Sequence, residues 1–556
     1  MKIARLKLVN FRSFKAETID FQDIVVLIGE NNAGKSNILK ALDLFFSDTK
    51  TLSEEFFNDR EKPIIIQVAF NQLSNAAKEQ FAKYLLDDGE TVIIKKEYHL
   101  VPEADMKLFA VMTGEKYGQE KKDSKKTADA IEILDKEQIA PFAIDGKTYF
   151  WKEKPFGWSA VATGYLPDFL YVPAVKDVGE EAKVTSTSRF GRLINAMLDK
   201  ALQNADLIRI NEEFTKLLSG SNENQDGRIE QIGEFERQLS EKLGKHMKGA
   251  TLKLDISPPT IKDVFQKGTH ILVNDGVTTP VEFRGHGMQR SVIFVIFQAY
   301  TEFLKKNQDK DSLKSLIFGF EEPELYLHPQ MQRTMFSVLK EISKSDQVIF
   351  TTHSSFFVEM SNHRSIGIVV KRDLKEGSKV IQCQQEIFPE TEERKQFQLL
   401  NEFDPERNEM FFGRKVILVE GDTEKVVLPL LASKFDNSYV FHENGITVVE
   451  CGGKGFMPLF ARVLNCFRVP YVAIYDKDGA EGANLNQKIE NLVSASAGIG
   501  RSECFDPDFE TICKNGGVQF VQERNKAFVA YKTFRDMDVQ SVPERLKQLV
   551  ESIFKE

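Results

Sequence analysis

Hydrophobic and polar residues alternate along the first eleven positions of the chain, and a continuous apolar run follows at residues 24–28. Alternation predicts a half-buried strand, and a short apolar run that ends in glycine predicts a fully buried one. Residues 36–46, SNILKALDLFF, then place apolar side chains at helical spacing. A glycine-rich loop is therefore expected between a buried strand and a helix.

Later apolar runs predict more strands, and a charged helical stretch interrupts them. Strands are expected at residues 62–70, 91–100, 169–177, 250–256, 270–276, 315–320 and 347–353, and then at 415–420, 445–450 and 471–476. Helices are expected at 189–205, 228–247 and 288–306. The helical stretch predicts an insertion in the form of a surface hairpin, and the strands after residue 410 are expected to form a new α/β unit.

The loop after the second strand reads GENNAGKS and matches G-x-x-x-x-G-K-[ST] in full. Gly29 and Gly34 let backbone N–H groups turn toward phosphate oxygens, and the following helix adds a favourable dipole. Lys35 is expected to pair with the β- and γ-phosphates, and Ser36 to hold Mg²⁺. The intervening Asn31 and Asn32 complete the predicted ATP-binding loop.

An acidic partner for this loop is expected where the strand at 315–320 ends. There Glu321 would hold Mg²⁺ through water, and Glu322 would polarise the water that attacks the γ-phosphate. Aspartate is usual at the first of these positions, so Glu321 is expected to reshape the metal coordination. His353 ends the strand at 347–353 and is placed to sense the γ-phosphate. A solvated acidic turn and a structural histidine are the alternatives.

A second set of carboxylates follows the strands of the last α/β unit. Glu420 ends one strand, and Glu424 lies one helical turn later if a helix begins near Gly421. Asp476 and Asp478 end another strand, where residues two apart face the same side. Such pairs at strand ends suit two Mg²⁺ or Mn²⁺ ions and phosphodiester cleavage. Each pair taken alone is also compatible with a solvated acidic turn. A third acidic cluster contains Asp508 and Glu510.

Composition sets wider limits. The 556 residues suggest about three or four domains, and the net charge of −9 disfavours general adhesion to nucleic acid without excluding a local site. The absence of a secretory signal and of a membrane-length apolar run predicts a soluble cytoplasmic protein with no membrane partner. The five cysteines, which form no C-x-x-C pair, are expected to be reduced thiols.

The motif order NFRSF, GENNAGKS, FRGHGMQRS, FGFEEPELYLHP and TTHSS resembles that of ABC-type ATPases that handle DNA. In that family the glycine signature reaches ATP bound on the opposing subunit. The resemblance therefore implies that Gly285, Gly287 and Gln289 act in trans. It also implies that Gln330 lies near the seam of a homodimer or higher homo-oligomer.

The strand-end glutamate followed by Asp-x-Asp resembles the Toprim domain of topoisomerases, primases and some nucleases. Together with the ATPase motifs, the chain resembles an OLD-family (overcoming lysogenization defect) endonuclease over nearly its full length. The resemblance implies an α/β chain with four parts: ATPase segments at 1–175 and 251–395, a helical dimerisation insertion at 176–250, and a parallel-sheet, Rossmann-like Toprim nuclease domain at 411–556.

The OLD resemblance also implies site residues and partners. The implied metal ligands are Glu420, Glu424, Asp476, Asp478, Asp508 and Glu510. A lysine near the C-terminus would stabilise the transition state, and Lys526 fits best, with Lys532 as the alternative. The implied activity is ATP-gated, metal-dependent cleavage of DNA in anti-phage defence, with a helicase-like partner, a retron or neither. The alternatives are a primase- or topoisomerase-like Toprim enzyme and a structural DNA-maintenance ATPase with an inactive Toprim domain. Whether ATP activates or inhibits cleavage stays open.

Overall fold

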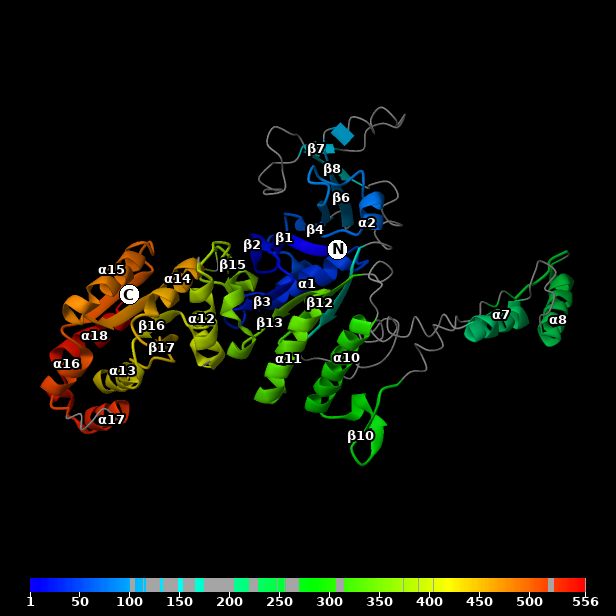
Figure 1. Cartoon of the computed structure of the whole chain (residues 1–556). Coiled ribbons are helices and arrows are strands. Elements are labelled where there is room, and N and C mark those ends of the chain that lie inside the picture. Colours follow the sequence, from blue (N-terminus) through cyan, green and yellow to red (C-terminus); the bar gives the residue numbers. More distant parts are fainter. Residues whose placement is uncertain are drawn as a thin grey trace. The chain divides into compact units, whose positions relative to one another are not determined.

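A computed structural model gives the fold of the chain (Figure 1). It describes residues 1–100, 106–113, 115–116, 131–133, 149–153, 166–174, 205–219, 229–247, 249–254, 256, 270–306, 315–373, 375–388, 390–403, 405–518 and 525–555. Contacts divide the chain into two compact units. The first contains residues 1–171, 311–324 and 329–556, and the second contains residues 172–310 and 325–328.

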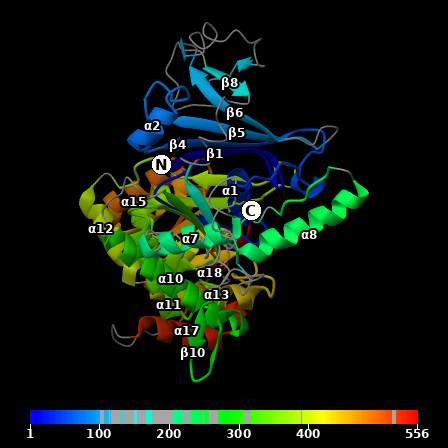
Figure 2. The same cartoon turned by 90° about the vertical axis from the view of Figure 1, so that its right-hand side faces the viewer.

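The first unit begins with an antiparallel sheet. Its strands have the order β2-β1-β4-β5-β6-β8-β7, and the central ones lie side by side in Figure 2. Their bounds are β1 Lys2–Phe11, β2 Phe14–Asp20, β4 Ile64–Asn71, β5 Val92–Tyr98, β6 Met106–Thr113, β7 Ile131–Ile133 and β8 Tyr149–Glu153. Helix α2 spans Asn75–Gln80. The strands expected at 1–11, 62–70 and 91–100 are confirmed as β1, β4 and β5.

A second, six-stranded sheet carries the expected nucleotide-binding motifs. Its order is β15-β14-β3-β13-β12-β9, and β14, β3, β13 and β12 run parallel to one another. The bounds are β3 Ile24–Ile28, β9 Asp168–Val172, β12 Leu316–Glu321, β13 Gln347–Thr351, β14 Ile366–Val370 and β15 Lys379–Gln382. Helix α1 (Lys35–Phe46) follows β3, and α11 (Pro329–Ile342) follows β12. Because β13 lies between β3 and β12, the loops after these three strands are neighbours.

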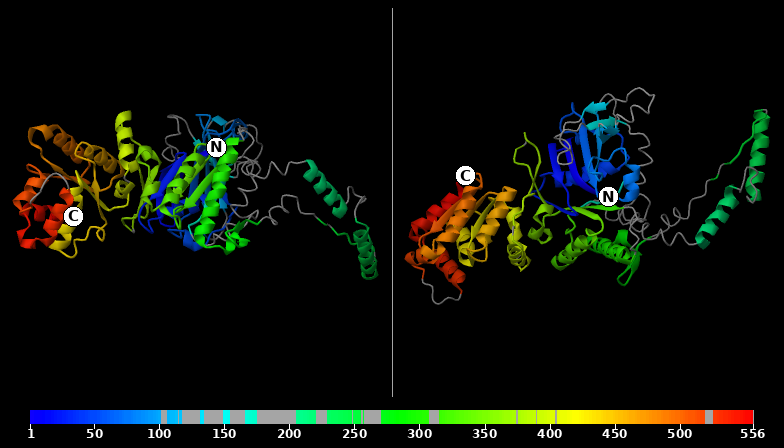
Figure 3. Two further views of the ribbon diagram at one scale, coloured as in Figure 1. Left: turned by 60° about the horizontal axis from the view of Figure 1, so that its bottom comes forward. Right: turned by 45° about the horizontal axis from the view of Figure 1, so that its top comes forward.

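The C-terminal part of the first unit is a separate parallel sheet of order β17-β16-β18-β19. Helices cover both of its faces in Figure 3. The strands are β16 Lys415–Val419, β17 Ile446–Glu450, β18 Tyr471–Asp476 and β19 Gly500–Phe505. The helices are α12 Thr391–Phe403, which precedes the sheet, and then α13 Asp422–Phe435, α14 Met457–Phe467, α15 Gly479–Ser494, α16 Phe509–Asn515, α17 Lys526–Asp536 and α18 Glu544–Phe554. The predicted fold class, an ATPase-type sheet followed by a parallel Toprim-type sheet, is confirmed.

The second unit contains α7 (Ala205–Ser219), α8 (Glu230–His246), β10 (Leu272–Asn274), β11 (Thr278–Pro280) and α10 (His286–Lys306). The helices expected at 228–247 and 288–306 are confirmed. Residues 189–204 of the other expected helix lie outside the described residues, as does the expected start of the insertion at residue 176.

The strand expected at 250–256 is wrong for the residues that are described there. Side chains of α8 take the place of a neighbouring strand in satisfying this backbone. Ser240 exchanges hydrogen bonds with the backbone of Leu252, and Glu236 accepts from the N–H of Leu254. An apolar alternation alone does not reveal such a partner.

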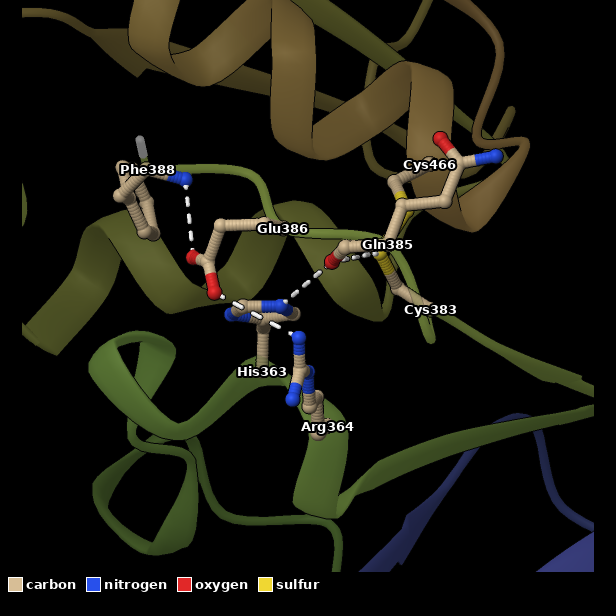
Figure 4. The surroundings of a disulfide bond; sticks show 7 residues. All are labelled: His363, Arg364, Cys383, Gln385, Glu386, Phe388 and Cys466. Carbon is tan, nitrogen blue, oxygen red and sulfur yellow. Dashed lines mark hydrogen bonds and ion pairs between the residues drawn. A yellow bond between two sulfur atoms is a disulfide. The ribbon is translucent and has the colours of Figure 1, made fainter. Parts of the chain in front are cut away.

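Two of the five cysteines form a disulfide, so the expectation of reduced thiols throughout is wrong for them. Cys383, just after β15, is bonded to Cys466 in α14, and their Cα atoms lie 5.5 Å apart (Figure 4). Because the two cysteines lie 83 residues apart, local spacing in the sequence could not predict this pair. The disulfide joins the ATPase-type part of the first unit to its Toprim-type part. The other three cysteines are free.

None of the helices in the described part of the chain combines the length and the apolar character needed to cross a membrane.

Candidate active sites

The loop between β3 and α1 has the backbone of a phosphate cradle. Gly29 and Gly34 have φ of 141° and 113°, which side chains disfavour, and a Cβ on Gly29 would lie 2.1 Å from the carbonyl oxygen of Val369. Lys35 is buried, and its Nζ donates to the carbonyl oxygens of Gly29 and Glu30 at 2.9 Å. Its pKa is lowered by burial, and Glu322 and Glu324 act in the opposite direction. The ammonium is therefore held inside the loop that would surround a phosphate.

The two expected acidic residues at the end of β12 have different environments. Glu321 is buried, and its Oε1 accepts a hydrogen bond of 2.6 Å from the hydroxyl of Tyr171. Glu322 has a positive φ of 45°, and its side chain turns toward His353, with 3.6 Å between Oε1 and Nε2. Burial, followed by the charge of Lys35, lowers the pKa of His353. The structure thus brings Lys35, Glu322 and His353 to one edge of the sheet, as the sequence predicted.

A further acid at this edge, Glu324, escaped the sequence prediction. It is buried, and its Oε1 accepts from the hydroxyl of Thr352 at 2.8 Å and from the backbone N–H of His353 at 2.7 Å. Burial raises its pKa. Glu324 therefore fixes the segment that carries the histidine. The signal in the sequence was the EEPE run, of which only the first two acids were interpreted.

The glycine signature lies in the second unit, at the start of α10. Gly285 is exposed and precedes the helix, and Gly287 lies in its first turn. The side chain of Gln289 is buried and donates to the carbonyl oxygens of Glu282 and Arg284 at 3.1 and 2.9 Å. Gln289 therefore holds the preceding turn in this structure, and the expected contacts in trans stay a prediction.

The other residues expected at the nucleotide site, and Gln330 expected near the dimer seam, are exposed or partly buried. Asn31 and Asn32 are exposed in the loop, where Asn32 has a φ of 65°, and Ser36 is partly buried in the first turn of α1. Gln330 is exposed in the first turn of α11. The roles of these residues at the nucleotide and, for Gln330, at the dimer seam stay predictions.

The carboxylates of the Toprim-type domain converge at the carboxyl ends of its strands. Glu420 follows β16, and its Oε1 accepts from the backbone N–H of Asp476 at 2.6 Å. Asp476 ends β18, and its Oδ1 accepts from the backbone N–H of Phe509 at 2.9 Å. Glu424 is buried in the first turn of α13, whose N-cap is Gly421 as expected. These contacts join the first acidic pair to the Asp-x-Asp segment.

Asp478 reaches the site by a different route from the one expected. Strand β18 ends at Asp476, so strand alternation does not orient the second aspartate. Asp478 has a φ of 51° and is the N-cap residue of α15. Its Oδ2 lies 3.0 Å from Nζ of Lys454, which sequence reasoning missed. In the sequence, Lys454 is marked only by its place in the glycine-rich turn GGKG, and this pattern does not distinguish a functional lysine from a surface one.

The third cluster and the candidate lysine lie next to each other. Asp508 caps α16 and accepts from the backbone N–H of Thr511 at 2.6 Å. Glu510 forms an ion pair with Lys526, the first residue of α17. Lys532 is exposed further along the same helix. The contact with Glu510 favours Lys526 of the two candidates.

Burial and mutual repulsion make these carboxyl groups hard to ionise. Burial raises the pKa of Glu424 to about 8, with further contributions from Asp476 and Glu420. The pKa of Glu420 rises to about 7 and that of Asp476 to about 6, again mainly through burial. A bound cation would reverse this penalty because it favours the ionised forms.

The donor set fits hard divalent cations, since every candidate ligand is a carboxylate oxygen. Within the described residues, no group of three or more His, Cys, Asp or Glu side chains lies close enough together to hold a metal ion. The carboxylates are therefore expected to adjust when an ion binds. The ligand chemistry and the raised pKa values together fit a site for divalent cations.

Comparison with known families connects the two sites. Residues 1–358 match the model of an AAA ATPase domain, and residues 411–478 match that of the TOPRIM domain of overcoming lysogenization defect protein-like proteins. The chain belongs to the OLD family. The first match spans the phosphate loop, the end of β12 and His353, and the second spans the acids from Glu420 to Asp478. The third acidic cluster and Lys526 lie beyond the matched residues.

Curated relatives agree with this assignment. The chain is 26% identical to the Old nuclease of Escherichia phage P2, over 86% of this chain and 77% of that protein. It is 23% identical to the OLD nuclease of Thermus scotoductus, over 99% and 98%. It is 22% identical to Endonuclease GajA of Bacillus cereus, over 86% and 75%. The prediction of an enzyme that combines an ATPase domain with a nuclease domain is confirmed.

Proposed function

We propose that this OLD-family protein is an ATP-binding and ATP-hydrolysing, metal-dependent DNA endonuclease. One observation carries the proposal: Glu420, Glu424 and Asp476 lie at the carboxyl edge of the Toprim sheet, Glu420 accepts from the backbone N–H of Asp476, and the pKa values of all three acids are raised. A chain does not gain stability from placing one buried and two partly buried acids near one another, so the cluster fits a site that receives cations. The names of the relatives as nucleases support this function.

The chain's own residues would divide the work of DNA cleavage. Glu420, Glu424, Asp476 and Asp478 would hold the metal ions, with Asp508 and Glu510 completing the ligands. Bound ions would supply an activated water and stabilise the leaving oxygen. Lys526 would place its ammonium beside the phosphate and offset the charge that develops there. Glu420 and Asp476 are already oriented by backbone hydrogen bonds, which lowers the cost of arranging the site.

ATP would act on this site as a control. In the ATPase domain, Lys35 and Ser36 would bind phosphate and Mg²⁺ with Glu321, and Glu322 would orient the attacking water while His353 senses the γ-phosphate. A direct contact joins the phosphate loop to the nuclease domain: Oε1 of Glu30 lies 2.7 Å from Nε of Arg414, just before β16. ATP can shift the nuclease only by favouring one arrangement of the chain, and this contact offers a route.

The wider setting is proposed by analogy with the family. A homodimer in which Gly285 and Gly287 complete the ATP site of the partner would make ATP binding and assembly interdependent. DNA is the proposed substrate, in the cytoplasm and in anti-phage defence, either alone or with a helicase-like or retron partner. The sign of the ATP effect stays open.

Plasmid cleavage tests the proposal. Purified protein is incubated with supercoiled plasmid, with Mg²⁺, Mn²⁺ or EDTA, and with or without ATP. Nicked or linear product that needs a divalent ion supports the function. Plasmid that stays supercoiled in every combination, including those with any genetic partner, contradicts it.

A further inference from the structure

Lys454 contacts the Asp-x-Asp segment of the candidate nuclease site, although the sequence prediction gave it no role. It lies in the turn between β17 and α14, at the same sheet edge as the acids. Its side chain is 7% exposed. Nζ donates to the backbone carbonyl oxygen of Asp476 and to Oδ2 of Asp478, and it lies 5.4 Å from the ring centroid of Tyr475. A buried ammonium therefore bridges both ends of the Asp-x-Asp segment.

The turn that carries Lys454 also contacts the first acidic pair. The N–H of Gly453 donates to the carbonyl oxygen of Glu420 at 3.0 Å. Gly453 has a φ of 108°, so this path of the chain suits glycine. One short turn thus holds the backbone behind Glu420 and, through Lys454, the segment from Asp476 to Asp478.

Helix α15 leaves room for this ammonium. A Cβ on Gly482 would lie 2.9 Å from Nζ of Lys454 and 2.8 Å from Cβ of Asp478. Glycine within a helix costs roughly 1 kcal/mol relative to alanine. At Gly482 the absence of a side chain lets helix α15 approach the ion pair of Lys454 and Asp478 closely.

The charge of Lys454 also suits the cluster. The six candidate carboxylates carry six negative charges when ionised. Lys454 and Lys526 together supply two positive charges, and two divalent ions would supply the remaining four. With Lys454 fixed beside Asp478, the remaining negative charge of the cluster equals the positive charge of two divalent ions.

We propose that Lys454 is a positioning residue of the nuclease site, which holds the Asp476–Asp478 segment in the geometry that binds metal. The inference rests on the proposed function. Asp478 adopts a left-handed backbone conformation, which costs an aspartate free energy, and the ion pair with Lys454 offsets part of that cost. With Oδ2 engaged by the ammonium, Oδ1 of Asp478 would serve as the metal ligand.

The sign of one measurement separates positioning from simple electrostatics. Coulomb's law alone predicts that removing a positive charge from the site strengthens cation binding. Positioning predicts the reverse, because an aspartate that has lost its partner must be ordered by the ion itself. Mutating outer residues that orient ligands typically weakens metal binding about 10–100-fold.

The experiment is Mn²⁺ titration calorimetry on the full chain, with Lys454→Met compared with wild type. Lys477→Met is the matched control, since it removes a lysine from the same segment whose ammonium pairs with exposed Asp506 instead. We expect Lys454→Met to weaken Mn²⁺ binding at least about tenfold, and Lys477→Met to change it less than about twofold. A far-ultraviolet circular dichroism spectrum and a thermal unfolding profile like those of wild type show that the variant, including its nuclease domain, is folded.

Plasmid cleavage then separates a positioning role from a direct one. Lys454→Met should need more Mn²⁺ for cleavage but reach a rate within about threefold of wild type at saturation. Lys454→Arg keeps the charge and should retain most of the affinity, which provides the test if the Met variant does not fold. A folded Lys454→Met that binds Mn²⁺ as tightly as wild type or more tightly, or an Arg variant as impaired as the Met variant, overturns the inference. Wild-type protein that binds no Mn²⁺ contradicts the proposed function itself.

Discussion

Proton release on metal binding is the most quantitative consequence of the acidic cluster. Metal ions bind ionised carboxylates, so any proton that the free site holds must leave. With pKa values of about 8 for Glu424, 7 for Glu420 and 6 for Asp476, these three groups together are expected to hold between about one and two protons at pH 7. Mn²⁺ binding should therefore release between about one and two protons at pH 7, and only about 0.3 at pH 8.5.

Calorimetry in buffers with different ionisation enthalpies measures this release directly. The slope of the observed binding enthalpy against buffer ionisation enthalpy gives the number of protons. The variant Glu424→Gln removes the group with the highest pKa, so its release at pH 7 should fall to about half a proton. Because the released protons oppose binding, wild-type affinity should rise as the pH increases from 6 to 8.

Two results would refute this reasoning. One is a release close to zero at pH 7, which would mean that the carboxyl groups are already ionised in the free protein. The other is a release from Glu424→Gln equal to that of wild type, which would assign the protons to other groups. Either result would show that burial and repulsion do not raise the pKa values of these carboxyl groups as described.

Further predictions concern the ATP effect, ATP hydrolysis and the disulfide. Glu30→Gln should keep ATP binding but reduce the effect of ATP on plasmid cleavage, because it removes the ion pair with Arg414. The control Glu54→Gln, which removes another exposed ion pair, should leave the ATP effect unchanged. An unchanged ATP effect in Glu30→Gln would exclude the contact with Arg414 as the route. Glu322→Gln should lower ATP hydrolysis by about 100-fold or more without loss of ATP binding, and normal turnover would contradict its assigned role. The unreduced, denatured protein should show three thiols to a thiol reagent and five after reduction, because Cys383 and Cys466 are bonded. Loss of this 83-residue link in Cys383→Ser should lower the unfolding free energy by up to about 4–5 kcal/mol, which denaturant titration measures.

The sequence predicted those parts of the sites that depend on strand ends. Parallel strands place their carboxyl ends at one edge, so the loops with Lys35, Glu322 and His353 could be assigned to one site from their order alone. The same logic located Glu420 and Asp476. In both domains a short apolar run followed by glycine or an acidic residue was sufficient to locate the strand end that carries the site residues.

What the sequence did not reveal depends on contacts between distant segments. Lys454 reaches Asp478 across 24 residues and Glu324 supports the histidine segment across 29, and no local period records such pairs. The disulfide of Cys383 and Cys466 is of the same kind. The predicted orientation of Asp478 was wrong for a local reason. Strand β18 ends at Asp476, two residues earlier than the alternation argument required.

The central claim is that DNA is cut in the Toprim domain, by acids that are distinct from those of the ATPase. Parallel assays of plasmid cleavage and ATP hydrolysis on Asp476→Ala test it most directly, with Asp506→Ala as the control because that neighbour is exposed and pairs with Lys477. We predict that Asp476→Ala loses metal-dependent cleavage and keeps ATP hydrolysis, and that Asp506→Ala keeps both. Cleavage by Asp476→Ala at the wild-type rate would contradict the account.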